Sequence, residues 1–82
     1  MVSISNLLKE LENLSLQLNI KVRYEKTTAK GGLCKLNDQY MIIIDRKAKD
    51  DYKAQVIAKS LKQFDLSNVH LKPKIREFID EA

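Results

Sequence analysis

The chain has 82 residues, a formal net charge of +4 and 44% hydrophobic side chains. This length and composition predict one small globular domain, residues 1–82, and exclude a disordered chain. No apolar run approaches the roughly 20 residues that a transmembrane helix needs, so we expect no membrane partner. The chain start lacks the basic and apolar regions of a signal peptide, and the single Cys34 cannot form an intrachain disulfide. Both features indicate a cytoplasmic protein.

Apolar side chains at three- and four-residue steps predict an amphipathic helix over residues 5–18. The apolar stripe consists of Ile4, Leu7, Leu8, Leu11, Leu14 and Leu18, and Leu16 lies off it. Ser3 or Ser5 can cap the start of this helix, because a serine oxygen accepts from the unpaired amides of the first turn. Asn19 suits the left-handed conformation that commonly ends a helix.

Residues 20–25 then alternate between apolar and charged side chains, which indicates a strand with one buried face. After a polar loop that ends in a glycine pair, residues 33–36 and 39–44 form the two strands of a predicted hairpin. Its turn is Asn37-Asp38, two residues that tolerate the positive φ of a two-residue turn. Tyr40 to Ile44 is the most apolar and β-branched stretch, which predicts a strand buried on both faces.

A second apolar stripe predicts a helix over residues 51–65, with Asp50 or Asp51 as its N-cap. Pro73 suits the first turn of a last helix, whose apolar face is Ile75, Phe78 and Ile79. The basic residues of this last helix precede its acidic residues, an order opposed to the helix dipole, so packing must hold it in place.

These elements predict an α+β fold in the order α-β-β-β-α-α. We expect a small two-layer domain with a three-stranded, mostly antiparallel sheet and helices packed on one face. Residues 7–65 resemble the zinc-peptidase-like domain of the ImmA/IrrE family. The members of this family are bacterial and phage anti-repressor metallopeptidases. The resemblance lies in the leading helix, the first strand, the hairpin and the apolar residues Val56 to Ala58 of the next helix.

The resemblance implies a His-Glu-x-x-His zinc motif on the helix that follows the hairpin. The positions of the motif's His, Glu and second His hold Lys59, Ser60 and Gln63 in this chain. Two histidines one turn apart bind the metal and the glutamate activates its water, so these replacements remove the activity. The resemblance therefore implies that this chain has the family's fold as a degenerate relative, and that it binds no metal or cofactor.

Few other residues could support catalysis. Cys34, His70 and Asp45 are the candidates for a distant alternative, an enzyme that uses a Cys34–His70 pair. One histidine cannot form a zinc site, which takes three or four protein ligands. Lys30 beside the glycine pair lacks the spacing of a phosphate-binding loop. We therefore expect a non-enzymatic domain of bacterial type that acts by protein–protein interaction, including as a homodimer through exposed strand edges.

Positive charge is concentrated in residues 21–62, where eleven Lys and Arg face five Asp and Glu. This segment predicts, as the alternative, a site for nucleic acid or an acidic partner, with Tyr24 and Tyr40 for base stacking if their rings are exposed. The simpler explanation is that lysines keep a small domain soluble and protect strand edges. The candidate contact residues are Lys21, Arg23, Lys26, Lys30, Lys35, Arg46, Lys47 and Lys49.

Overall fold

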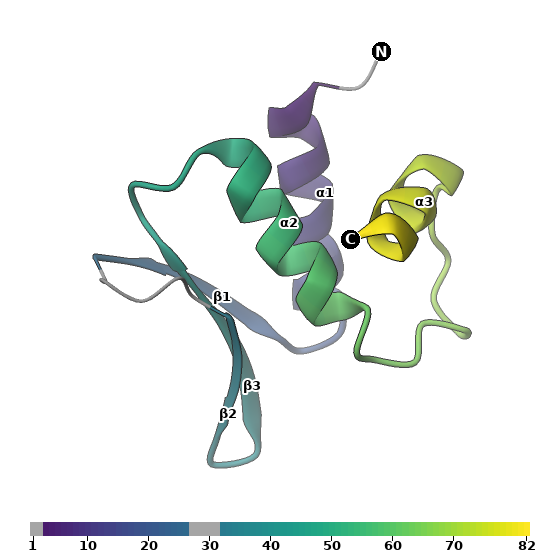
Figure 1. Ribbon diagram of the computed structural model, residues 1–82. Coiled ribbons are helices and arrows are strands. Elements are labelled where there is room, and N and C mark those ends of the chain that lie inside the picture. The colour runs from purple at the N-terminus through teal and green to yellow at the C-terminus, as the bar shows by residue number, and fades with distance from the viewer. Residues whose placement is uncertain (1–2, 27–31) are drawn as a thin grey trace.

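The structure is a computed structural model that describes residues 3–26 and 32–82. Its elements, in chain order, are α1 (Ile4–Gln17), β1 (Lys21–Glu25), β2 (Gly32–Leu36), β3 (Gln39–Asp45), α2 (Asp50–Leu61) and α3 (Pro73–Glu81). The predicted α+β class and the order α-β-β-β-α-α are confirmed (Figure 1). None of the described helices is long and apolar enough to span a membrane.

Local signals in the sequence explain both ends of α1. Of the two candidate caps, Ser3 is the N-cap, and its Oγ accepts a hydrogen bond from the backbone N–H of Asn6 (3.3 Å). Asn19 follows the helix with a φ of 61°, which is the predicted left-handed conformation. The chain then reverses, and the buried Ile20 leads into β1.

The hairpin of β2 and β3 forms as predicted. Asn37 and Asp38 have φ values of 51° and 66°, and two consecutive positive φ angles are what the favoured two-residue turn requires. Gly32 is the first residue of β2, whereas Gly31, the other half of the glycine pair, lies outside the described residues. The hairpin extends beyond the helices at its turn (Figure 1).

The sheet has the order β1-β3-β2 and is mixed, which corrects the expectation of a mostly antiparallel sheet. β2 is antiparallel to β3, with Leu33 opposite Ile42, whereas β1 is parallel to β3, with Val22 opposite Ile42. The tight turn determines only that β2 and β3 are antiparallel to each other. The apolar β3 buries the most surface when it is central, and β1 therefore pairs on its free side.

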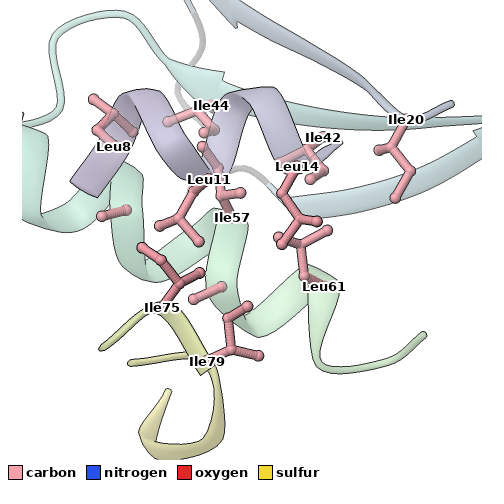
Figure 2. Close-up of a cluster of buried hydrophobic side chains, with 12 residues drawn as sticks. Leu8, Leu11, Leu14, Ile20, Ile42, Ile44, Ile57, Leu61, Ile75 and Ile79 are labelled. Atoms are coloured by element: carbon pink, nitrogen blue, oxygen red, sulfur yellow. The ribbon is translucent and has the colours of Figure 1, made fainter. Parts of the chain in front are cut away.

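Helices α1 and α2 pack on one face of the sheet, as predicted, and α3 packs on α1 and α2 (Figure 1). Figure 2 shows the core that results from this packing. The core consists of Leu8, Leu11, Leu14, Ile20, Ile42, Ile44, Ala54, Ile57, Ala58, Leu61, Ile75 and Ile79. Within the described residues α3 contacts helices rather than strands, so it adds a third layer to the two layers that were expected.

The start of α2 differs from the prediction by one residue. Lys49 occupies the N-cap position without a side-chain hydrogen bond, and Asp50 and Asp51 lie in the first turn. The two carboxylates still stabilise this end of the helix, because negative charge is favourable beside the unpaired amides of a first turn. The helix also ends at Leu61 rather than at residue 65.

Candidate functional site

One face of the sheet is left uncovered by every described element. Strand alternation directs Ile42 and Ile44 toward the helices, so Met41 and Ile43 point to the other side. No described helix covers this second side of β3, yet Met41 is only 8% exposed and Ile43 is half-buried. The expectation that β3 is buried on both faces therefore holds at Met41 and fails at Ile43. We call the uncovered side, formed by Met41, Ile43, Cys34 and Leu36 with the charged residues of β1, the open face.

The open face continues into a groove that reaches α1. This groove has a volume of about 890 Å³, and Leu16, Leu36 and Met41 are among its lining residues. Leu16 is 71% exposed and Leu36 is 61% exposed, although both are large apolar side chains. We call this hollow the Leu16–Leu36 groove.

The two ends of the open face differ in charge. Lys21 lies beside Met41 at the start of β1, whereas Glu25 lies beside Asp45 where β1 and β3 end. Arg23 lies between them, and its guanidinium forms an ion pair with Glu25 (2.8 Å). The face therefore has Lys21 at one end and two carboxylates at the other, one of which already pairs with Arg23.

The carboxyl ends of β1 and β3 bring four of the candidate basic residues into one region. The two strands are parallel, and the backbone N–H of Arg46 donates to the carbonyl of Glu25 (2.9 Å). Lys26 therefore continues from β1 next to the segment that carries Arg46, Lys47 and Lys49, all of which are exposed. We call these four residues the basic cluster.

The other candidate basic residues are placed elsewhere. Lys21 and Arg23 belong to the open face, whereas Lys35 lies on the covered face, with its Nζ 5.3 Å from the ring centre of Tyr40. Lys30 lies outside the described residues. The eight candidates therefore do not form one surface.

Tyr24 and Tyr40 are poorly placed for base stacking, because both are half-buried and their rings contact other side chains. The Tyr40 ring packs edge-on against Phe64 at 4.9 Å, and the Tyr24 ring lies beneath the Lys53 ammonium at 4.8 Å. The Tyr24 hydroxyl donates a hydrogen bond to Glu12. Burial and this hydrogen bond raise the pKa of Tyr24 above its ordinary value.

The candidate catalytic residues occupy three separate places. Cys34 is exposed on the open face, whereas His70 lies beside α1 on the helical side of the sheet. Asp45 ends β3, and its Oδ1 accepts a hydrogen bond from the backbone N–H of Lys47 (3.1 Å). No three His, Cys, Asp or Glu side chains of the described chain are grouped to hold a metal ion.

The three positions that replace the zinc motif also differ in environment. Lys59 and Gln63 are exposed, and Gln63 follows the end of α2. Ser60 is buried and donates a hydrogen bond from its hydroxyl to the carbonyl of Val56 (2.8 Å). This bond within the helix satisfies the buried hydroxyl.

A second groove lies on the helical side of the molecule, between α1 and α3. Its volume is about 830 Å³, and it is open to solvent along both helices. Leu7, Pro73, Ile75 and Phe78 provide apolar lining, and Lys9, Glu10, Lys72 and Lys74 are its charged residues. We call it the α1–α3 groove.

Neither groove was anticipated from the sequence. Leu16 was the available signal for the first, because it is a large apolar side chain that lies off the helix stripe. The basic start of α3, without an acidic residue in its first turn, was the signal for the second. Comparisons of the chain with protein-family models, curated proteins and solved structures found no match in any of the three.

Proposed function

We propose that the protein is a non-enzymatic interaction domain that works by protein–protein contact, and that its open face binds a second copy of the chain. The observation that carries this proposal is the Leu16–Leu36 groove, which two largely exposed leucines line together with the buried Met41 and with polar and charged side chains. Single exposed apolar side chains are ordinary, whereas a contiguous apolar surface marks an interaction site.

A second copy suits this face because Lys21 and Asp45 lie on it at opposite ends, with the basic cluster in the segments that follow Glu25 and Asp45. A twofold axis across the strands would lay two open faces together, with Lys21 of one copy near Asp45 of the other. A twofold interface uses the same patch on both copies, so a surface must complement itself. Two sheets packed in this way enclose their inner side chains in a layer about 10 Å thick.

Sedimentation equilibrium over a range of protein concentrations tests this assembly. The unchanged chain should form a dimer, and Leu36→Asp should weaken the dimer by about tenfold or more, because the carboxylate would be desolvated between the copies. The matched control is Ile4→Asp, which places the same charge at an exposed apolar position on α1, outside the Leu16–Leu36 groove. Circular dichroism checks that both variants are folded.

Cys34 provides a second readout of the same contact. Its thiol is exposed on the open face, so the rate of its reaction with a maleimide should fall as the dimer forms. A chain that remains monomeric at millimolar concentration, or an Ile4→Asp variant that weakens the dimer as much as Leu36→Asp, would overturn the proposal.

The basic cluster supports nucleic-acid binding as a second candidate function. Parallel pairing gathers Lys26, Arg46, Lys47 and Lys49 at one edge, where they could neutralise neighbouring phosphates. Fluorescence anisotropy with labelled single- and double-stranded nucleic acid at several salt concentrations tests this function. Binding that falls steeply with salt and is lost in Arg46→Glu supports it, and absence of binding at low salt eliminates it.

A further inference from the structure

We infer that the α1–α3 groove is a second docking site, which takes an amphipathic helical peptide with acidic residues along its edge. This site goes beyond the contact proposed for the open face. The open face lies on the side of the sheet away from the helices, whereas the α1–α3 groove lies within the helix layers. The two surfaces could therefore be occupied at the same time.

The shape and lining of the α1–α3 groove favour a helix. Its lining is mostly apolar, with Leu7 from α1 and Ile75 and Phe78 from α3. A partner helix that lies between two helices places residues at positions i, i+3, i+4 and i+7 on such a surface. No described strand borders this groove, so addition of a partner strand does not apply here.

The charged residues of the groove favour acidic side chains in the partner. Lys9, Lys72 and Lys74 line it, and Glu10 is its one acidic lining residue among the described residues. The Glu10 carboxylate already forms an ion pair with Lys72, so Lys9 and Lys74 retain uncompensated charge. Acidic residues of a partner would be complementary to this rim.

The start of α3 adds to the positive potential of the same rim. Lys72 is the N-cap of α3 without a side-chain cap, and the first turn contains no acidic residue. Lys74 and Arg76 therefore add positive charge at the end of the helix where the dipole is already positive. A carboxylate from a partner would be stabilised there by the lysines and by the positive end of the helix dipole.

Fluorescence anisotropy with two labelled synthetic peptides tests the site. Both are 16-residue helices with leucines at i, i+3, i+4 and i+7, flanked by glutamates in one and by lysines in the other. We expect the glutamate peptide to bind the full chain at least about tenfold more tightly than the lysine peptide, because like charges across the rim are unfavourable.

Matched variants locate the binding within the protein. Lys74→Glu should weaken the glutamate peptide by about tenfold, whereas Lys59→Glu, the same charge change at an exposed position of α2 outside the groove, should have little effect. Leu36→Asp should leave peptide binding unchanged, which separates failure of this site from failure of the open-face dimer. The chain's unfolding in urea checks that each variant is folded.

Three results would overturn the inference. The first is equal binding of the glutamate and lysine peptides, which would mean that the lysine rim selects nothing. The second is no binding of the glutamate peptide at low salt. The third is an equal loss of binding in Lys59→Glu and Lys74→Glu. Sedimentation of the protein with phosphatidylglycerol vesicles that is lost in Lys74→Glu and kept in Arg46→Glu, without binding of the glutamate peptide, would assign the groove to an anionic lipid surface instead.

Discussion

Individual side chains connect the sheet to the helix layer, and Tyr24 is the clearest case. Its ring lies under Lys53 of α2, and its hydroxyl donates to Glu12 of α1, so one residue of β1 contacts both helices. Alternation along β1 predicted that Tyr24 would face inward. The hydrogen bond to Glu12 could not be predicted, because it depends on how α1 lies across the strand.

Tyr24 makes the stability of the protein sensitive to alkaline pH. The folded state raises the pKa of this phenol, first through burial and then through Glu12, so the folded protein keeps a proton that the unfolded chain releases near pH 10. The corresponding stability is fully present below about pH 10 and declines as the pH rises further. Urea unfolding between neutral pH and pH 11 should show this decline.

The variant Tyr24→Phe separates the two contributions of the hydroxyl. We expect the free energy of unfolding to fall by about 1 kcal/mol at neutral pH, because one hydrogen bond is lost. Above about pH 10 the free energy of unfolding of this variant should decline less steeply with pH than that of the unchanged protein, because the phenol with the raised pKa is absent. Tyr52→Phe, in a more exposed ring, serves as the control. If the free energy of unfolding declined equally steeply with pH in Tyr24→Phe and in the unchanged chain, this account would be contradicted.

Among the elements, those with strong local signals match the sequence most closely. The Asn37-Asp38 turn, the left-handed Asn19 and Pro73 at the start of α3 are each determined by backbone preferences of one or two residues. The sequence predicted Asp50 or Asp51 as the N-cap of α2, because aspartate is a favoured cap when only neighbouring residues are considered. Lys49 takes that position once the turn after β3 is formed.

Helix α3 is held by packing although its charges oppose the helix dipole. Ile75 and Ile79 are buried against the other helices, whereas Lys74 lies in a first turn without acidic residues. Lys74→Glu should therefore raise the free energy of unfolding by about 0.5–1 kcal/mol, because a negative charge replaces a positive one at the helix start. Urea unfolding measures the change, and Lys74→Gln should give an intermediate value.

The same variant distinguishes stability from binding. Lys74→Glu is expected to stabilise the chain and to weaken binding of the glutamate peptide. Lost binding could therefore not be attributed to unfolding. A lower free energy of unfolding in Lys74→Glu than in the unchanged protein would show that Lys74 stabilises α3 by another contact.

At the scale of the whole molecule, one small core supports all three layers. Ile57 is fully buried in α2, the helix that contacts α1, α3 and the hairpin strands. Ile57→Ala should cost about 2–5 kcal/mol through lost burial and the cavity that remains. A domain of this size has only about 4–12 kcal/mol in total, so the loss is a large share of its stability and should lower the melting temperature markedly.

Thermal unfolding followed by circular dichroism measures this effect. Ile57→Val should cost only about 0.5–1.5 kcal/mol, because most of the side chain remains. Lys59→Ala, at an exposed position of the same helix, should change stability by less than about 0.5 kcal/mol. A near-neutral Ile57→Ala would show that the helix layer can collapse around the lost volume.

The amino-acid sequence by itself determined the number, type and order of the elements, because hydrophobic period, helix ends and turns depend on neighbouring residues. Alternation in β3 also determined that two sets of side chains point to opposite sides. Tertiary structure alone decided the strand order β1-β3-β2, the parallel pairing of β1 and the absence of a described layer over Met41 and Ile43. The Leu16–Leu36 groove follows from those arrangements, whereas the α1–α3 groove follows from the packing of α3 on α1. Each groove joins residues from different elements, whose relative placement depends on how the core packs.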